Sequence, residues 1–376
     1  MTDQVPALLT RRGLLRALAG GALAGLGCRS RPSTGHFRAF PIRNLDGFLT
    51  PADDFFIRDH FGVPRLPNAS NWKVAVTGEV EQSLSVALAA GDLPKLELPV
   101  TLECAGNAGR NHPERGRAWG GASTAVFEGF SLAAVLALAR PRPGVREVVL
   151  EGADSGSEPG AAGVLTFARS VPLAAAFHPS AMLATRMNGE ALPARHGGPL
   201  RAVFPGRYAT DSVKWLRRIR LVTEPFQGFY QERRYRRAGP GDPRGESLGR
   251  LRIQSEICNP SPHQTLRAGR LVDINGVAWG GEAGVARVDV SVDGGATFAP
   301  ATFLDPARPT CWRRWSLVWR PERMGSFRIL ARATDGRGSA QPFASDDELG
   351  RSHSLSGPTY VDYANNSVPR IDIQVA

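Results

Sequence analysis

The sequence has few cysteines and no long apolar run, and both shortages narrow what it can encode. Its most apolar stretch, 13–27, is shorter than the about 20 apolar residues that a bilayer-spanning helix needs. The four cysteines are Cys28, Cys104, Cys258 and Cys311, with no CxxC pair and no zinc spacing. A zinc finger is therefore excluded, and a disulfide between Cys258 and Cys311 is left open.

The sequence also lacks any nucleic-acid-binding signature, although its net charge is +11. No helix-turn-helix, paired-cysteine finger or RNA-recognition motif is present. The basic residues are mostly arginine and are spread along the chain, and the densest run, RRYRR at 233–237, is typical of a solvated loop. We expect no nucleic-acid partner, and the charge favours the binding of an anion inside a site.

Glycine and proline are abundant, with 42 and 29 residues, which favours short strands and turns over long helices. Between 51 and 225, strand-like alternation mixes with helical spacing at 131–139 and a helix-start pattern after Pro51. From about 250 the chain becomes a series of short alternating strands separated by turns. We predict an α+β fold: a linker over 29–50, a mixed domain over 51–240 and an immunoglobulin-like β-sandwich over 241–376.

The N-terminus has the features of a targeting segment over residues 1–28. Arg11 and Arg12 precede a short run of apolar and small residues, similar to a twin-arginine export signal. This predicts a periplasmic or otherwise exported protein. Cys28 ends the run with Gly25 three places before it, an imperfect lipoprotein match that leaves a lipid anchor open.

The stretch TLECAGNAGR (101–110) raises the question of what Cys104 does. It follows a strand-like run and precedes a glycine-rich turn whose backbone can approach a ligand closely. Taken alone, Cys104 fits a buried core thiol best, and a nucleophile or metal ligand less well. Other polar residues stand in nearby loop-like segments: Arg58 and His60 in FFIRDH, and His196 and Arg201 around a Gly-Gly-Pro turn.

Together these segments resemble one family. FFIRDHFGVP, TLECAGN, WGGASTAVFEGFSL, MNGEALPARHGGPLRAVFPG and VKWLRRI occur in the order found in the sulfite oxidase family of molybdenum enzymes. GVAWGG, VSVDGGATF and WRRWSLVWRP are similar to that family's C-terminal dimerisation domain. The resemblance covers roughly residues 40–375. It implies a molybdopterin-binding domain followed by a domain that pairs two subunits, hence a homodimer.

The resemblance also implies a molybdenum–molybdopterin cofactor, with Cys104 as the protein's ligand to the metal. Arg201 and Lys214 would hold the cofactor's phosphate, and the two histidines would donate to the pterin. The implied cofactor contacts are Phe56, Arg58, His60, Cys104, Asp154, His196, Arg201, Ser212, Val213 and Lys214. The implied catalytic residues are Arg58, Cys104, Arg110 and Trp119.

Two departures from the family bear on the substrate. Arg110 stands one place later than the family's spacing after the cysteine. The sulfite-oxidising members carry a tyrosine after the strand equivalent to LRRIRLV, but here Gln227 or a neighbour stands in the matching place. We therefore expect a pocket without that tyrosine, which argues against sulfite itself as the substrate. The expected substrate class is an oxyanion or a sulfur-containing small molecule.

The sequence contains no CxxCH motif and no segment similar to a haem domain, so no haem is expected in this chain. Electrons would pass to a separate carrier such as a cytochrome c. Three functions follow: an exported sulfite dehydrogenase-like oxidase, a molybdopterin-dependent sulfoxide reductase, or an exported binding protein without catalysis. The family's reductases generally lack the C-terminal domain, which favours the oxidase.

Overall fold

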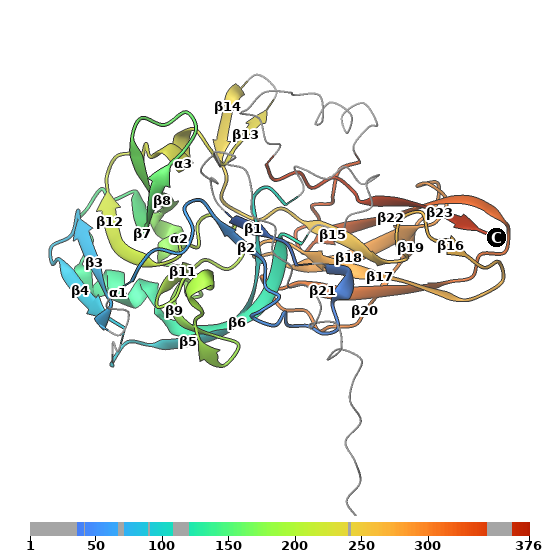
Figure 1. Ribbon diagram of the computed structural model, residues 1–376, viewed down its shortest axis with the longest axis horizontal. Coiled ribbons are helices and arrows are strands. Elements are labelled where there is room, and N and C mark those ends of the chain that lie inside the picture. Colours follow the sequence, from blue (N-terminus) through green and yellow to red (C-terminus); the bar gives the residue numbers. More distant parts are fainter. Residues whose placement is uncertain are drawn as a thin grey trace, which may run out of the picture. The chain divides into compact units, whose positions relative to one another are not determined.

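Strands make up most of the structure, with only a few short helices between them (Figure 1). The structure is a computed structural model of the chain, and it describes residues 36–40, 42–66, 71–88, 91–107, 120–239, 242–343 and 363–376. The chain divides into two compact units, Met1–Ser33 and Thr34–Ala376, and all described residues belong to the second.

The first part of this unit contains two sheets of five strands each. In one sheet the order is β10-β9-β6-β5, with β11 paired to β9: Glu190–Ala191, Met182–Met187, Ala122–Ser131, Lys95–Glu103 and Arg201–Val203. In the other the order is β4-β3-β12-β7-β8: Leu84–Ala87, Lys73–Gly78, Leu216–Val222, Glu147–Ser157 and Val164–Pro172. Strands β12 and β3 pair in parallel, and the other pairs in these two sheets are antiparallel.

The predicted helix at 131–139 forms as α1, Leu132–Ala139. Ser131 caps its N-terminus by accepting a hydrogen bond from the amide of Ala134. Its buried residues recur at helical spacing, so one face packs into the core: Leu132, Val135, Leu136 and Ala139. Two further helices are single turns, α2 at Leu173–Ala176 and α3 at Phe229–Glu232.

Residues 254–375 contribute two sheets that pack face to face. One sheet has the order β15-β17-β21-β20: Gln254–Asn259, Val272–Trp279, Arg313–Trp319 and Thr302–Phe303. The other has the order β16-β23-β22-β18-β19: Thr265–Leu266, Arg370–Val375, Gly325–Asp335, Val285–Ser291 and Ala299–Pro300. Buried residues of both sheets form one apolar cluster, so this part is a sandwich. The immunoglobulin-like assignment stays a prediction.

The two parts are joined by a shared core and by hydrogen bonds between buried groups. Trp279 and Trp312 of the sandwich belong to the same apolar cluster as the sheet around β5. The indole of Trp279 donates to Glu103 at 2.9 Å, and that of Trp312 donates to the carbonyl of Phe48 at 2.7 Å. The sandwich therefore packs directly against the strand that leads to Cys104.

Two sequence expectations differ from the structure. Residues 36–50 do not form an extended linker, because β1 (His36–Arg38) pairs with β2 (Ile57–Asp59) and Phe40 lies in the core. A short 3-10 helix, η1 (Ile42–Asn44), follows. After Pro51 the chain makes turns instead of a helix. The structure also settles the disulfide that the sequence left open, because Cys258 and Cys311 are both free.

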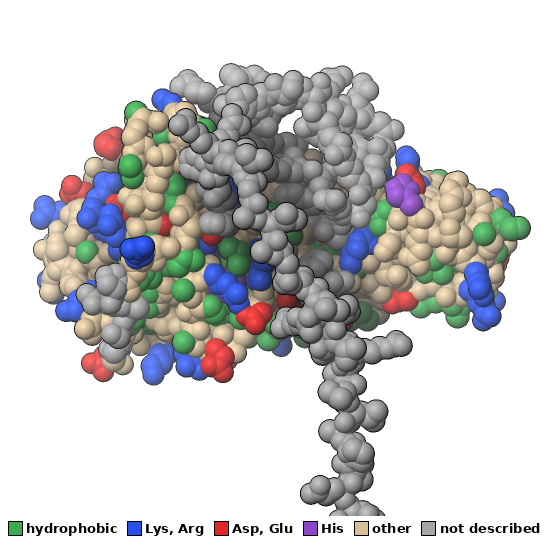
Figure 2. All heavy atoms as spheres, viewed as in Figure 1, with side chains coloured by type: hydrophobic (Ala, Val, Ile, Leu, Met, Phe, Trp, Pro, Cys, Tyr) green, Lys and Arg blue, Asp and Glu red, His purple; other side chains and the backbone are tan. Residues whose placement is uncertain are grey.

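Residues 226–239 and 242–249, here called the bridging segment because they lie between the two parts, are also ordered by contacts. It contains α3 and a two-stranded ribbon, β13 (Arg236–Gly239) with β14 (Asp242–Ser247). Among the described residues, no helix is long and apolar enough to cross a bilayer. Figure 2 shows Lys and Arg side chains scattered over the described surface, with acidic side chains between them.

A buried arginine of the first part, which forms an ion pair there, also holds the bridging segment through hydrogen bonds to its backbone. Arg169 in β8 donates to the carboxylate of Asp211 at 3.0 Å, and neither side chain is exposed. The same guanidinium donates to the backbone carbonyls of Tyr230 and Leu248, each at 2.7 Å. Asp211 also accepts from Arg207 at 2.9 Å. Four segments distant in sequence therefore meet at one guanidinium.

We predict that Asp211→Asn lowers the free energy of unfolding by about 3–5 kcal/mol, because Arg169 would remain buried without its counter-charge. The control is Glu151→Gln, which removes an acid whose partner Arg217 is largely exposed. Its expected cost is about 0–1 kcal/mol. Urea unfolding of the two variants at pH 7 measures both values, and equal losses would contradict the assignment.

Candidate active site

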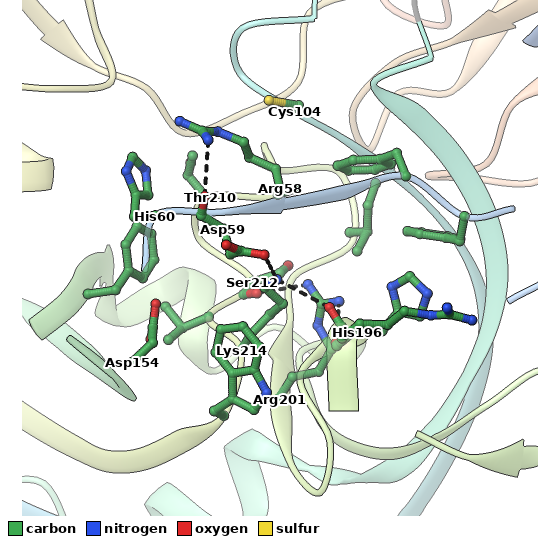
Figure 3. Close-up of a pocket in the computed structure, with 18 of the residues that line it drawn as sticks. Arg58, Asp59, His60, Cys104, Asp154, His196, Arg201, Thr210, Ser212 and Lys214 are labelled. Atoms are coloured by element: carbon green, nitrogen blue, oxygen red, sulfur yellow. Dashed lines mark hydrogen bonds and ion pairs between the residues drawn. The ribbon is translucent and has the colours of Figure 1, made fainter. Parts of the chain in front are cut away.

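One pocket gathers loops that leave strands of both sheets in the first part of the chain (Figure 3). All ten residues that the sequence marked for cofactor contact line it: Phe56, Arg58, His60, Cys104, Asp154, His196, Arg201, Ser212, Val213 and Lys214. Arg110 and Trp119 lie outside the described residues. The pocket is thus the meeting place of segments more than 150 positions apart, while the individual roles of these residues stay predictions.

Cys104 follows β5 directly and is held by a tight turn. Its amide donates to the carbonyl of Gly121, and its own carbonyl accepts from Asn107, both at 2.8 Å. The side chain of Asn107 donates to Glu103 and accepts from the amide of Gly121. A Cβ at Gly121 would lie 2.5 Å from the Asn107 oxygen, so only glycine fits there. These contacts hold the thiol in the pocket.

Arg58 lies beside Cys104 at one end of the pocket in Figure 3. It is the middle residue of β2, and its guanidinium donates to the carbonyl of Asp59 at 3.0 Å. Burial opposes its charge, but the neighbouring Tyr235, Cys104 and Tyr363 raise the pKa of Arg58 overall. A permanently charged group therefore stands next to the thiol.

Tyr235 corrects the expectation of a pocket without a tyrosine. It is 4% exposed, and it lines the pocket together with Cys104 and Arg58. Burial raises its pKa, so the phenol stays protonated at neutral pH. From the sequence, Gln227 and its neighbours were considered, and Tyr235, the fourth aromatic residue of the segment 223–235, was passed over. The turns of α3 decide which side chain reaches the pocket, and the sequence does not reveal them.

Lys214 packs closely against two glycines. A Cβ at Gly197 would lie 2.8 Å from the Lys214 side chain, and one at Gly152 would lie 2.9 Å from the Lys214 carbonyl. The ammonium donates to the carbonyl of Arg195 at 3.3 Å and lies 3.9 Å from Asp59. Burial lowers the pKa of Lys214 to about 8, which leaves it mostly charged at neutral pH.

Arg201 and His196 already make hydrogen bonds to the backbone. Arg201 donates to the carbonyls of His196 and Ser212, each at 2.9 Å, and burial lowers its pKa to about 9. His196 contacts the carbonyl of Ala52 through Nε2 at 2.7 Å. A carbonyl only accepts, so Nε2 carries the proton. Burial lowers the pKa of His196 to about 4, so the ring is neutral and Nδ1 offers a lone pair.

His60 uses both ring nitrogens inside the protein. Nδ1 contacts the carboxylate of Glu158, and Nε2 lies 2.6 Å from the hydroxyl of Tyr235. These contacts therefore do not favour the expectation that both histidines donate a hydrogen bond to a bound pterin. His60 is already satisfied, and His196 presents an acceptor.

Several buried polar atoms of the pocket have no protein partner: Asp154 Oδ1, Thr210 Oγ1 and Arg195 Nε. Such atoms are rare in protein interiors because each costs free energy, and at a pocket wall they indicate a polar ligand. Burial raises the pKa of Asp154 to about 7. Three pocket residues had no role assigned from the sequence. Asp59 and Arg195 lie within the motif blocks quoted above, whereas no sequence feature marked Thr210.

The charges of the pocket wall favour an anion. Four cationic side chains line it: Arg58, Arg195, Arg201 and Lys214. The facing acids are Asp59 and Asp154, and the pKa of Asp154 near 7 leaves it partly protonated at neutral pH. A group with a phosphate, several N–H donors and a bond to the Cys104 sulfur would meet all of these features. The residues present therefore fit a molybdopterin cofactor.

Comparison with protein families gives two matches along the chain. The oxidoreductase molybdopterin binding domain matches residues 60–230. The Mo-co oxidoreductase dimerisation domain matches residues 246–349. Both ranges fall inside the two domains expected from the sequence, whose outer bounds stay predictions.

Individual proteins match over most of the chain. Sulfite oxidase of Gallus gallus is 35% identical over 333 residues, which cover 81% of this chain and 71% of that protein. Sulfite oxidase of Arabidopsis thaliana is 33% identical over 341 residues, which cover 81% of this chain and 86% of that protein. In structure, the sulfane dehydrogenase SoxCD from Paracoccus pantotrophus matches with a TM-score of 0.76 at 25% identity, over 94% of this chain and 92% of that one.

We predict that Asp154→Asn stabilises the cofactor-free protein, and more so at pH 8 than at pH 5. The pKa of about 7 in the folded state lies above the 3.8 of an ordinary aspartate, so the wild type loses stability as the pH rises from the lower value to about 7 and stays at the lower stability above it. Asparagine does not ionise and avoids this loss. Thermal unfolding at both pH values measures the gain, and an equal gain at both would contradict the raised pKa.

Proposed function

Because the chain belongs to the sulfite oxidase family of molybdopterin-dependent oxidoreductases, we propose that it oxidises a small sulfur-containing anion by oxygen-atom transfer. The observation that carries the proposal is the joint placement of Cys104, Arg58 and Tyr235 in one pocket. This pocket supplies a thiol for a metal, a fixed cation for an oxyanion, and a neutral hydroxyl.

Each part of the cofactor has a matching residue in the pocket. Cys104 would bind the molybdenum through its sulfur. Lys214 and the remaining donors of Arg201 would hold the phosphate, and Asp154 Oδ1 would accept from a pterin N–H. The acceptor at His196 Nδ1 would take a second donor. When bound, this cofactor supplies the two-electron oxygen-atom transfer itself.

The protein's own contribution at the substrate is binding and orientation. Arg58 is fixed through its contact with the Asp59 carbonyl, so its remaining N–H donors can hold an oxyanion without a large entropy cost. The Tyr235 hydroxyl lines the same pocket. Its presence removes the earlier argument against sulfite. The name of the Paracoccus relative extends the candidate substrates to sulfane sulfur.

The oxidising direction is preferred over sulfoxide reduction because of the second domain. Residues 246–349 match the dimerisation domain, and the family's reductases generally lack it. A non-catalytic binding protein is set aside, because the chain belongs to a family of oxidoreductases. The same domain supports a homodimer as the functional unit.

We further propose a separate electron acceptor, such as a cytochrome c, and no haem in this chain. The oxidation releases two electrons per turnover, which a one-electron carrier would accept in two steps. Reduction of cytochrome c by the purified protein and its substrate would test this.

Export through the twin-arginine route is also proposed, with a lipid at Cys28 as an open addition. The support is the Arg11–Arg12 pair and the apolar run that follows it. Replacing both arginines by lysine should retain the protein in the cytoplasm. Cell fractionation measures this, and unchanged export of the variant would refute the route.

The central test is Cys104→Ser in protein made by a host that synthesises molybdopterin. We expect turnover to fall by more than the about 10–100-fold that loss of an outer-shell partner causes, because the metal loses its protein ligand. Cys258→Ser is the matched control and should stay active, since Cys258 lies outside the pocket and its thiol contacts the carbonyl of Ile42.

Substrate choice is decided in the same preparation. Oxidation of sulfite or a sulfane compound with cytochrome c is compared with reduction of methionine sulfoxide by an artificial donor. Molybdenum analysis accompanies both assays. A wild-type protein that binds no molybdenum, or a Cys104→Ser variant with full turnover, would refute the proposed function.

A further inference from the structure

Glu158, His60 and Tyr235 form a hydrogen-bonded chain that leads into the pocket. Nδ1 of His60 contacts Oε1 of Glu158, and Nε2 lies 2.6 Å from the Tyr235 hydroxyl. All three side chains are buried, with exposures of 8%, 7% and 4% for Glu158, His60 and Tyr235. Glu158 was not among the residues that the sequence marked, and it directly follows β7.

The surroundings of Glu158 favour its ionised form. Tyr230 donates its hydroxyl to the carboxylate at 3.0 Å, and Arg234 lies 3.5 Å from the second oxygen. Burial works against ionisation, but the contact with His60 and these neighbours lower the pKa of Glu158 overall. Burial also lowers the pKa of His60, so the ring is neutral. An ionised carboxylate only accepts hydrogen bonds.

These charge states determine the direction of both hydrogen bonds. Because the carboxylate accepts, the single proton of the neutral imidazole lies on Nδ1 of His60. Nε2 then has a lone pair, so the hydroxyl of Tyr235 must be the donor across the 2.6 Å contact. The tyrosine oxygen has only lone pairs left for the pocket.

The ring of His60 is also fixed in orientation. Phe167 stacks on it, with ring centroids 5.5 Å apart and planes at 18°. Tyr230 packs on it with a centroid distance of 4.5 Å. A flip of the imidazole would displace these rings and break both hydrogen bonds. The arrangement therefore acts as a rigid connector between the carboxylate and the tyrosine.

We propose that Glu158 is a positioning residue that holds His60 in its Nδ1–H tautomer and thereby commits the Tyr235 hydroxyl proton to His60. The Tyr235 oxygen consequently faces the pocket as a hydrogen-bond acceptor. It can accept from the guanidinium of Arg58 or from a protonated substrate or water, and it does not itself donate to a bound oxyanion. The tautomer assignment stands alone, whereas its effect on turnover rests on the proposed function.

The test reads the tautomer directly in the cofactor-free protein. The chain is labelled with ¹⁵N-histidine, and two-dimensional NMR at pH 7.5 distinguishes protonated from unprotonated ring nitrogens. The signals of His60 are identified by their loss in His60→Gln. Wild type should show a proton on Nδ1 and a lone pair on Nε2. A proton on Nε2 in wild type would overturn the proposal.

Glu158→Gln should shift the tautomer ratio of His60 by about tenfold or more, because a hydrogen bond to a charged acceptor is replaced by an amide that can also donate. Glu151→Gln is the control, since Glu151 lies on the same strand β7 but pairs with Arg217 at the surface. An unchanged ratio in Glu158→Gln would contradict the role of the glutamate.

Tyr235→Phe provides a second variant should Glu158→Gln fail to fold. With Glu158 in place, His60 should keep the Nδ1–H tautomer even without the phenol. A proton that moves to Nε2 in this variant would mean that the tyrosine sets the tautomer, which overturns the proposal. In cofactor-loaded enzyme, Glu158→Gln should lower kcat by about 10–100-fold with a smaller change in KM. A protein without turnover refutes the proposed function and leaves the NMR result decisive.

Discussion

The buried guanidinium of Arg169 is the constraint on which the pocket depends. It joins β8 to Asp211 and to two carbonyls of the bridging segment, at Tyr230 and Leu248. Asp211 directly precedes Ser212, so the same ion pair also fixes the loop that carries Lys214. A buried charge without its partners is strongly destabilising. The guanidinium therefore keeps β8, the Asp211 loop and the bridging segment in contact. The positions of Lys214 and Tyr235 therefore follow from one electrostatic requirement.

Within that frame the pocket wall keeps features that a stable interior would avoid. Asp154 and Thr210 have buried oxygens without partners, and Lys214 and Arg201 bring two charges into one space. Burying such groups costs free energy in the cofactor-free protein. A ligand with complementary groups offsets this cost when it binds. The same unsatisfied atoms that weaken the empty protein are thus those that would recognise the cofactor.

The sequence predicted a large part of this arrangement. The helix at 131–139 and the strand-rich second half were predicted from local pattern, and the ten residues that the motif blocks marked for cofactor contact all line one pocket. The errors share one physical origin. Residues 36–50 contain a proline and a glycine and show no regular period, yet Phe40 is buried in a core cluster with residues of distant strands. Tyr235 lines the pocket and Glu158 contacts His60, and these two residues lie 175 and 98 positions from His60 in the chain.

The sequence by itself determined the chemical inventory: one thiol in a glycine-rich turn, the cations that accompany it, and membership of a molybdopterin-binding family. These are local properties, because residue type and spacing act over a few positions. Only the tertiary structure decided which tyrosine lines the pocket, which histidine nitrogen is free, and which glutamate orients His60. Hydrogen-bond direction and burial depend on neighbours brought together by folding, and no stretch of sequence contains them.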